Sequence, residues 1–456
     1  MNTSERLAPP PSGAEAEVAT ELNLEEAIAY AVALHRQRRL DPAEALYRRI
    51  LEVAPEHPDV LHFLGVLTNQ KGRPDEAIAL IEQAIAMVPD FPDFHNNLGN
   101  ILALAGRLDE AERHYRRVLE LRLETPDTLS NLATLCRAQD RFGEAEALLN
   151  TALSIAPDHL KSLNNFGLLC DQLERHDDAI GYYSRAISLM PQHADGHHLL
   201  GALYFTQGRL QEAADVYRHW MEVMPDHPTP RHMYAACSGI DVPVRAADDY
   251  VERTFDLFAE SFEQQLQQKL SYRAPELVAE ASARVLPAPC HALDVLDAGC
   301  GTGLCGPLFK PWARRMVGVD LSSGMLQKAT GKACYDELIK AELTSWIAAH
   351  PVQFDLIVSA DTLCYFGSLA EPIQAAARAL RGGGVLTFSV EATDESIADE
   401  GHKINPHGRY SHTVGHIEAC LRASGFERCS IDSAILRTEN GKPVEGLVVV
   451  ARKPQN

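Results

Sequence analysis

The stretch "LDAGCGTGLCG", residues 296–306, decides how the second half of the chain folds. It holds four glycines within eight positions, and an apolar run at 293–296 leads directly into it. A short apolar strand followed by a glycine-rich turn is typical of the first turn of a βαβ unit, where the backbone lies close to a ligand. Residues 301–306 also fit G-x-G-x-x-G, the pattern of dinucleotide-binding proteins.

Strand and helix patterns alternate after this stretch. Apolar runs of strand length recur at residues 316–319, 355–360, 385–390, 428–436 and 445–451. A helix is expected over 372–380, and a glycine-containing turn joins the last two runs. This order predicts a doubly wound α/β sheet that ends in an antiparallel hairpin at its edge.

One residue inside the stretch argues against a dinucleotide. In the dinucleotide pattern the strand runs straight into the first glycine, which leaves backbone amides free for a pyrophosphate. Here Asp297 stands two positions before Gly299, and its carboxylate would repel a diphosphate. The same carboxylate suits S-adenosylmethionine, which carries a positive α-amino group and a sulfonium but no phosphate. Asp320, at the end of the second strand, suits a ribose in either cofactor.

The segment Asp297–Gly303 resembles the D/E-x-G-x-G-x-G loop of class I S-adenosylmethionine-dependent methyltransferases, and a C-terminal antiparallel hairpin is typical of the same family. The resemblance covers residues 292–452 and implies a Rossmann-like methyltransferase domain with S-adenosylmethionine as cofactor. It also implies that Asp297 orients the methionyl amine and Asp320 holds the ribose. The residues expected at the cofactor site are Asp297, Gly299, Cys300, Gly301, Gly303, Asp320, Leu321, Met325, Glu342 and Asp361.

Some of these roles have alternatives. Asp361 is equally well a solvated acid at the end of the strand 355–360, and Glu342 follows a third strand that the sequence marks poorly. Tyr272 and Arg273, at the end of a helical segment before the domain, are candidates for a lid over the methionyl carboxylate.

The sequence identifies no single catalytic residue. Methyl transfer from a sulfonium is an in-line displacement, in which alignment of the acceptor and exclusion of water supply much of the rate. A general base is needed only when the acceptor carries a proton of high pKa. The candidates are Glu391, Arg409, His412 and Tyr365. The segment 408–412 carries Arg409 and His412. The alternative interpretation is that it is an ordinary surface loop.

The first half of the chain repeats every 34 residues. Prolines follow this period, with one member missing, at Pro55, Pro89, Pro157, Pro191 and Pro225. Small residues recur at Ala31, Gly65, Gly99, Ala133, Gly167 and Gly201. Larger residues recur at Tyr47, Ile81, Tyr115, Leu149, Tyr183 and Tyr217. Several series that coincide at one period indicate a repeated structural unit, and proline is a residue that cannot continue a helix.

These series resemble the tetratricopeptide repeat (TPR) family. The resemblance implies an all-α solenoid of about six repeats, a capping helix near 229–237, and a concave groove that binds a protein or peptide. Asn97, Asn131 and Asn165 lie on the helix face that lines such grooves and are candidates for binding a peptide backbone. Alternatively, their amides make hydrogen bonds between repeats or face solvent.

The two resemblances together divide the chain into four parts. We expect a disordered tail over residues 1–21 and a TPR superhelix over 22–240. A helical linker or lid is expected over 241–290, and a methyltransferase domain over 291–456.

Composition argues against several classes of binding partner. A formal net charge of −21 argues against intact nucleic acid. No apolar run approaches the length of a membrane span and residues 1–20 lack a signal peptide's apolar segment, so we expect a soluble, cytoplasmic protein with no membrane partner. The 10 cysteines include no C-x-x-C pair and the 19 histidines show no ligand spacing, so no metal is expected.

The main hypothesis is therefore a methyltransferase whose TPR groove docks a protein partner or substrate. The alternative is a TPR scaffold with an S-adenosylmethionine-binding domain that is regulatory or weakly active. A third hypothesis, an NAD(P)- or flavin-dependent oxidoreductase, is disfavoured by Asp297. No motif in the sequence identifies the methyl acceptor.

Overall fold

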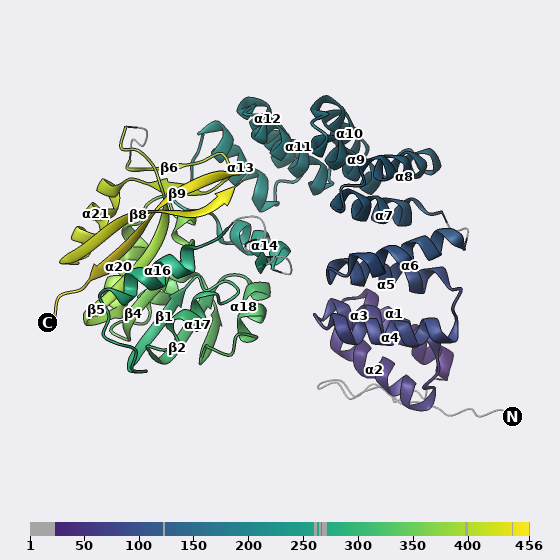
Figure 1. Cartoon of the computed structure of the whole chain (residues 1–456), viewed down its shortest axis with the longest axis horizontal. Coiled ribbons are helices and arrows are strands. Elements are labelled where there is room, and N and C mark those ends of the chain that lie inside the picture. Colours follow the sequence, from purple (N-terminus) through teal and green to yellow (C-terminus); the bar gives the residue numbers. More distant parts are fainter. Residues whose placement is uncertain are drawn as a thin grey trace. The chain divides into compact units, whose positions relative to one another are not determined.

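The computed structural model describes residues 23–121, 124–259, 262–263, 266, 271–396, 400–439 and 441–455. The expected N-terminal tail, residues 1–21, lies outside them. The chain divides into two compact units, Met1–Leu199 and Leu200–Asn456, and Figure 1 draws both.

The first unit is built from helical hairpins. The first helices of successive hairpins begin at residues 24, 58, 92, 126 and 160, and the second helices at 40, 74, 108, 142 and 176. The period of 34 residues predicted from the sequence is therefore the period of the helices. These are α1 (Leu24–Arg36), α2 (Leu40–Val53), α3 (Pro58–Gln70), α4 (Pro74–Met87), α5 (Pro92–Leu104), α6 (Leu108–Glu120), α7 (Pro126–Ala138), α8 (Phe142–Ile155), α9 (Leu160–Gln172) and α10 (His176–Leu189).

The repeating small and large residues face each other inside each hairpin. A Cβ atom placed on Gly99 would lie 2.7 Å from Cε1 of Tyr115, and one placed on Gly167 would lie 2.3 Å from Cε1 of Tyr183. Non-bonded carbon atoms prefer separations of about 3.5–4.0 Å, so no side chain fits there. Each glycine therefore lets a buried tyrosine ring of the second helix pack against the backbone of the first.

An arginine stands directly before the second helix of each repeat, in a periodic series that we did not predict. Its members are Arg39, Arg73, Arg107, Arg141, Arg175 and Arg209. Arg141 pairs with Glu112 of the preceding repeat at 2.6 Å and with Glu144 of its own helix at 3.3 Å. The side chains are partly exposed, so each pair adds at most about 1 kcal/mol. Arg73, Arg141 and Arg175 thus link their repeats to the preceding ones.

Gly167→Ala is expected to destabilise the protein by about 1–3 kcal/mol, because the added methyl group would displace the Tyr183 ring. Gly181→Ala is the matched control, since Gly181 lies in α10 and a Cβ there meets no atom within 4 Å. The control should be neutral or stabilising by up to about 1 kcal/mol, because alanine favours the helix. The urea midpoint of the helical circular dichroism signal measures both, and equal midpoints for the two variants would contradict this packing.

The second unit begins with repeat helices and continues into an α/β domain. Helix α11 (Ala194–Thr206) crosses the division between the units. The helices that follow are α12 (Leu210–Val223), α13 (Pro228–Ser238), α14 (Asp248–Phe258), α16 (Ala274–Ala283), α17 (Cys305–Phe309), α18 (Ser323–Thr330), α19 (Leu343–Ala348), α20 (Ala370–Ala379) and α21 (Val414–Ala423), with a 3-10 turn, η1 (Leu363–Tyr365). None of the helices within the described ranges combines the length and the apolar character needed to cross a bilayer.

The sheet of this domain has the predicted doubly wound topology. Its strands are β1 (Leu293–Ala298), β2 (Ala313–Asp320), β3 (Glu337–Lys340), β4 (Phe354–Ser359), β5 (Leu380–Ala392), β6 (His402–Ile404), β7 (Tyr410–His412), β8 (Arg428–Glu439) and β9 (Lys442–Arg452). Strands β3, β2, β1, β4 and β5 are parallel neighbours in that order. Strand β9 runs antiparallel to β5 and carries β8 outside it, so the C-terminal hairpin is confirmed (Figure 1).

Successive residues of β1 enter two different cores. Val295 belongs to the core that includes residues of α16 and α17, whereas Leu296 belongs to the core that includes residues of α19, α20 and α21. Helices therefore cover both faces of the sheet, which is why its central strands are nearly continuous apolar runs. The carboxyl ends of the strands are left to form a site.

The segment 408–412 is not an ordinary surface loop. Tyr410 and His412 are buried in β7, which pairs with the end of β5 and with β6. Before the strand, the carbonyl oxygen of Gly408 lies 2.7 Å from Nε2 of His232 in α13. The His232 ring stacks on Tyr250 with centroids 4.1 Å apart. The last repeat helix thus packs directly on the α/β domain.

Candidate active site

The loop after β1 carries three glycines with left-handed backbone. The φ angle is +78° at Gly299, +53° at Gly301 and +85° at Gly303, a region that residues with a side chain rarely adopt. A Cβ on Gly299 would lie 2.3 Å from the side chain of Thr362, whereas one on Gly301 would meet no atom within 4 Å. Gly299 is therefore required by packing, and Gly301 presents bare backbone to open space.

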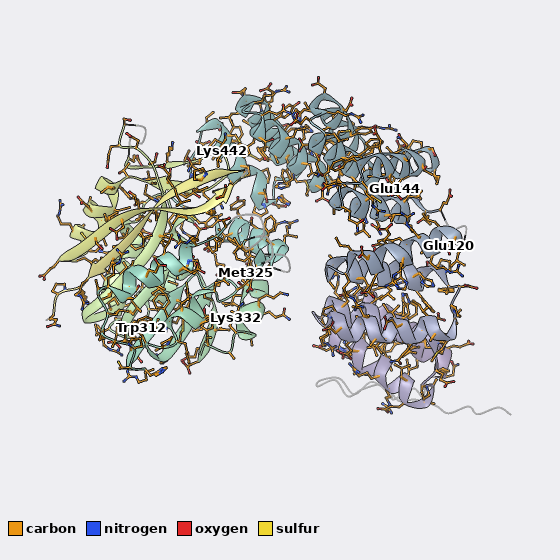
Figure 2. The ribbon with its side chains drawn as sticks, viewed as in Figure 1. Glu120, Glu144, Trp312, Met325, Lys332 and Lys442 are labelled. Carbon is orange, nitrogen blue, oxygen red and sulfur yellow. The ribbon has the colours of Figure 1, made fainter. Side chains whose placement is uncertain are left out.

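A pocket lies at the carboxyl ends of β1, β2 and β4. This is the edge at which doubly wound sheets bind their ligands. The expected cofactor residues on its wall are Gly299, Gly301, Asp320, Leu321, Met325, Glu342 and Asp361. Met325, labelled in Figure 2, lies on α18, is 1% exposed and lines the pocket.

The segment before the domain, which we expected to be a helical linker or lid, supplies a second wall of the pocket through residues that we did not assign from the sequence. Its lining residues are Arg245, Ala246, Val251, Phe255 and Phe262. The sequence does space Phe255 and Phe262 as one apolar face of a helix, but it does not say what that face covers. In the structure this face covers the pocket, so it shields the site from water.

Polar contacts hold this second wall in place. The backbone N–H of Ala246 donates to the carbonyl of Tyr365 at 2.8 Å. In α14, Oδ1 of Asp256 accepts hydrogen bonds from the Ser322 hydroxyl at 2.5 Å and from the Gly324 N–H at 3.0 Å. Helix α14 is thereby attached to the start of α18 beside the pocket.

Asp320 ends β2 with both carboxylate oxygens hydrogen bonded. Oδ2 accepts from the Gly301 N–H at 2.9 Å, and Oδ1 accepts from the Ser322 N–H at 2.8 Å. Burial raises the pKa of Asp320, while these N–H donors act to lower it. A carboxylate offers about four lone-pair sites, so Asp320 retains capacity for two hydroxyl donors.

Asp297 is not among the residues on the pocket wall, although it belongs to the same loop. Its side chain is 1% exposed, and Oδ2 accepts a hydrogen bond from the Tyr335 hydroxyl at 2.6 Å. Oδ1 has no hydrogen-bond partner among the residues that the structure describes. Burial raises the pKa of Asp297 to about 7, although the Tyr335 hydrogen bond lowers it. A buried oxygen without a donor is unfavourable, which suits it to a donor from a ligand.

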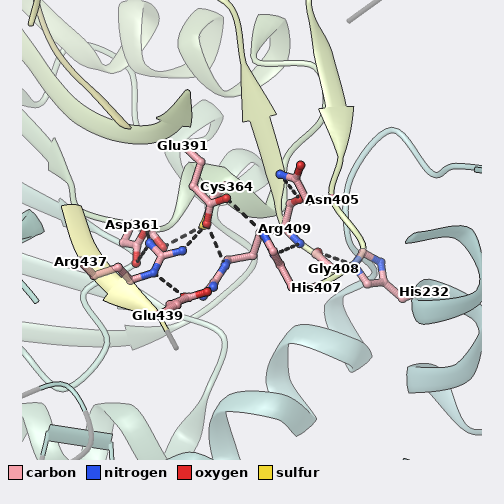
Figure 3. Close-up of polar contacts among 10 residues, drawn as sticks. All are labelled: His232, Asp361, Cys364, Glu391, Asn405, His407, Gly408, Arg409, Arg437 and Glu439. Atoms are coloured by element: carbon pink, nitrogen blue, oxygen red, sulfur yellow. Dashed lines mark hydrogen bonds and ion pairs between the residues drawn. The ribbon is translucent and has the colours of Figure 1, made fainter. Parts of the chain in front are cut away.

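Asp361 joins the pocket wall to a buried ion network, drawn in Figure 3. Nη1 of Arg437 lies 2.9 and 3.0 Å from the two carboxylate oxygens of Asp361. Arg437 also pairs with Glu391 and Glu439, and Arg409 pairs with the same two glutamates. The network thus satisfies three carboxylates with two guanidinium groups.

The pKa values in this network follow from burial and from the arginines. Burial raises the pKa of Glu391, although Arg409 and Arg437 act to lower it. Burial would also raise the pKa of Glu439, but the same arginines outweigh it and hold that pKa at about 2. His407 is partly buried beside Arg409, and desolvation together with that positive charge lowers its pKa to about 4. At neutral pH His407 is therefore uncharged and Glu439 is ionised.

Models of known families match both parts of the chain. A methyltransferase-domain model matches residues 296–388. Tetratricopeptide-repeat models match residues 60–93, 92–156, 124–192 and 172–237. The chain joins tetratricopeptide repeats to a class I methyltransferase domain.

The relatives that match this chain are methyltransferases of several kinds. A malonyl-(acyl-carrier protein) O-methyltransferase from Enterobacter lignolyticus is 35% identical over 116 residues, which are 25% of this chain and 45% of that protein. A ubiquinone biosynthesis O-methyltransferase from Thiobacillus denitrificans is 33% identical over 108 residues, 22% of this chain and 46% of that protein. Each alignment thus spans less than half of the relative. A solved S-adenosylmethionine-dependent methyltransferase from Mesorhizobium loti is 26% identical, with a TM-score of 0.31, over 38% of this chain and 96% of that one.

The methyltransferase domain implies S-adenosylmethionine as cofactor, and the residues present fit it. Asp320, Glu342 and Asp361 make the pocket wall acidic, which disfavours a pyrophosphate and suits a cation without phosphate. The open space beside Gly301 leaves room for a ligand against the backbone, and Oδ1 of Asp297 lacks a donor. Within the described ranges, no group of three or more His, Cys, Asp and Glu side chains could hold a metal ion.

Some expected cofactor residues have structural contacts of their own. Glu342 caps α19, where its carboxylate accepts from the N–H groups of Thr344 at 3.0 Å and Ser345 at 2.7 Å. Burial would raise the pKa of Glu342, but these hydrogen bonds outweigh it and the pKa is lowered. Cys300 and Gly303 are not on the pocket wall, and Cys300 is buried.

The candidate catalytic residues lie in three different environments. Tyr365 lies on the pocket wall, where burial raises its pKa well above the ordinary value. Glu391 and Arg409 belong to the ion network. His412 is fully buried, with Nε2 at 2.9 Å from the carbonyl of Phe366, and burial lowers its pKa to about 3. His412 therefore supports the pocket wall as a neutral side chain.

Tyr272 and Arg273, the candidates for a lid, are not on the pocket wall. Tyr272 packs against the core that includes α16, and burial raises its pKa well above the ordinary value. Arg273 is exposed, with Nη2 at 3.7 Å from Glu280. Their proposed contact with a methionyl carboxylate stays a prediction.

The three asparagines of the repeats make hydrogen bonds between repeats. Nδ2 of Asn97 lies 2.8 Å from Nε2 of His62, and Nδ2 of Asn131 donates to Oδ1 of Asn100 at 2.8 Å. Nδ2 of Asn165 donates to the Ser130 hydroxyl at 2.7 Å. This is the alternative role considered above, and the role in peptide binding stays a prediction.

Arg437→Met is expected to destabilise the protein by about 3–5 kcal/mol, because it leaves buried carboxylates without their cation. Unpaired buried carboxylates bind protons more readily in the folded state, so the deficit should shrink as the pH falls. Thermal unfolding at neutral and at acidic pH measures this. Arg284→Met is the control, since Arg284 and its partner Asp432 have 66% and 49% exposed side chains. An equal, pH-independent loss in both variants would contradict the network's role.

Proposed function

We propose that the chain is an S-adenosylmethionine-dependent methyltransferase whose repeats dock a protein partner or substrate. The observation that carries this proposal is the pocket whose wall brings together Gly301, Asp320 and Asp361 at the carboxyl ends of three parallel strands. The match of a methyltransferase-domain model to residues 296–388 supports it.

In this proposal the groups on the wall, and Asp297, which does not line it, each receive one part of the cofactor. Asp320 accepts hydrogen bonds from the ribose hydroxyls, while Leu321 and Met325 pack against the adenine. Glu342 approaches the adenine amino group, and Asp297 receives the α-amino group. When bound, S-adenosylmethionine supplies a methyl group that its sulfonium has already activated.

The chain's own contribution to the reaction is alignment and exclusion of water. Val251, Phe255 and Phe262 close one side of the pocket with apolar surface, which keeps water from the reacting atoms. Glu391 is held between two arginines and His412 is bonded to backbone, so neither is a strong base. We therefore assign the acceptor an atom that is nucleophilic at neutral pH without a general base, such as a carboxylate oxygen.

The repeats are proposed to bind an extended protein or peptide segment, because stacked helical repeats present a long concave surface. The Nδ2 atoms of Asn97, Asn131 and Asn165 are used between repeats, so a bound peptide would meet their Oδ1 atoms instead. Oδ1 of Asn131 already accepts from Lys161. Asn97 and Asn165 are therefore the better candidates.

The second candidate function is a TPR scaffold whose domain binds the cofactor but is regulatory or weakly active. One observation favours it: the charges of Asp361, Glu391 and Arg409 are already satisfied within the ion network. Among the candidate catalytic residues this leaves Tyr365 on the pocket wall. Cofactor binding without methyl transfer to any acceptor would support this function.

Calorimetry with S-adenosylmethionine and S-adenosylhomocysteine tests the cofactor assignment. Asp320→Ala should weaken the binding of both ligands by about tenfold or more, because it removes a charged acceptor of hydrogen bonds. Asp432→Ala is the control, since Asp432 is a half-exposed acid paired with Arg284. Neither NAD(P) nor a flavin should bind. A wild-type protein that binds neither S-adenosyl compound would overturn the proposed function.

Incubation of the full chain with cell extract and methyl-labelled S-adenosylmethionine tests the acceptor. Label is expected in protein, and Asp320→Ala, run in parallel, should abolish it. Label confined to small molecules would contradict the docking role of the repeats. Absence of any label, despite cofactor binding, would favour the scaffold.

A further inference from the structure

Tyr335 occupies a socket made by three glycines. A Cβ placed on Gly303 would lie 3.0 Å from Cε2 of Tyr335, and one on Gly318 would lie 3.0 Å from Cδ1. A Cβ on Gly306 would lie 3.0 Å from Cε2 and 3.1 Å from the hydroxyl oxygen. Two of the three glycines that match G-x-G-x-x-G thus make room for this ring.

The socket directs the tyrosine hydroxyl at one oxygen of Asp297. The hydroxyl donates to Oδ2 at 2.6 Å, a short distance typical of a hydrogen bond to a carboxylate. The ring packs against the core that includes residues of α16 and α17, so the donor is held by packing as well as by its hydrogen bond. With Oδ2 fixed, the orientation of the whole carboxylate is fixed.

The other oxygen of Asp297 lacks a partner, although Asp297 itself does not line the pocket. Asp297 is 1% exposed, and Oδ1 has no hydrogen-bond partner among the described residues. A buried acceptor left unsatisfied costs about 1–3 kcal/mol, and more when it is charged. An ammonium group on the ligand would satisfy Oδ1 and neutralise the carboxylate at the same time.

Resting on the proposed function, we propose that Tyr335 is a positioning residue for the cofactor: by holding Oδ2 of Asp297, its hydroxyl aims Oδ1 at the α-amino group of S-adenosylmethionine. The hydroxyl therefore selects for the amino-acid part of the cofactor and not for its adenosine part. A tyrosine that served packing alone would need the ring and not the hydroxyl.

Comparison of two ligands tests this. S-adenosylhomocysteine carries the amino-acid part, whereas 5′-methylthioadenosine keeps the adenosine and thioether but lacks that part. Tyr335→Phe keeps the ring in its socket and should weaken S-adenosylhomocysteine binding by about tenfold or more, while methylthioadenosine binding stays within about twofold. Tyr115→Phe is the control, because it removes a buried tyrosine hydroxyl bonded to Asn100 in the repeats.

Gly306→Ala is a second variant, which keeps the hydroxyl group on Tyr335 but displaces it. Its methyl group would press on the Tyr335 ring and should also weaken S-adenosylhomocysteine selectively. Equal losses for the two ligands, or no loss in Tyr335→Phe, would overturn the positioning role. A wild-type protein that binds neither ligand would instead overturn the proposed function on which this role rests.

The pH dependence of S-adenosylhomocysteine binding gives an independent readout. The titratable groups that face Asp297 are Tyr335, Asp320, Cys300 and Cys305, and burial keeps both thiols neutral by raising their pKa values. The pKa of Asp297 is about 7 and would rise without the tyrosine hydrogen bond. Protonated Asp297 attracts no ammonium, so binding should weaken as the pH falls through 7, and the midpoint should move upward in Tyr335→Phe. An unchanged midpoint would contradict the proposal.

Discussion

A glycine that leaves room for a tyrosine ring is the contact on which both parts of this chain depend. In the repeats, Gly99 and Gly167 let rings of the second helix reach the backbone of the first. In the α/β domain, Gly303 and Gly306 do the same for Tyr335. Interiors of proteins are packed as densely as organic crystals, so a ring of this size fits only where a neighbouring side chain is missing. The same rule thus sets the spacing of helices in one part and the shape of the cofactor loop in the other.

The ion network represents a different constraint, because buried charges are tolerated only with partners. Asp361 follows β4, Glu391 lies near the end of β5, and Arg437 lies in β8, so the network joins strands that are far apart in the sequence. It attaches the C-terminal hairpin to the wall of the pocket. That wall is consequently held by charge pairing on one side and by the apolar core on the other.

The features that the sequence predicts well are those with a local or periodic cause. The 34-residue series predicts the period at which the helices recur. The glycine-rich stretch after an apolar run predicts the loop at the end of β1. The features it does not predict depend on neighbours in space. The apolar face of α14 is visible, but not the pocket that it covers. Tyr335 precedes a strand that is weakly marked, and nothing local connects it to Asp297. The arginine series is periodic as well, but the sequence does not show that Arg141 pairs with Glu112 of the preceding repeat.

The packing of α13 on Gly408 also constrains how this chain can change during evolution. Repeats in a solenoid contact their neighbours only, so hairpins can be duplicated or lost with little effect elsewhere. Helix α13 does not have that freedom, since His232 is buried between Tyr250 and the backbone before β7. A gene fusion that exchanged the whole repeat array would remove part of the interior of the α/β domain. The final helix of the repeats is therefore structurally part of the α/β domain.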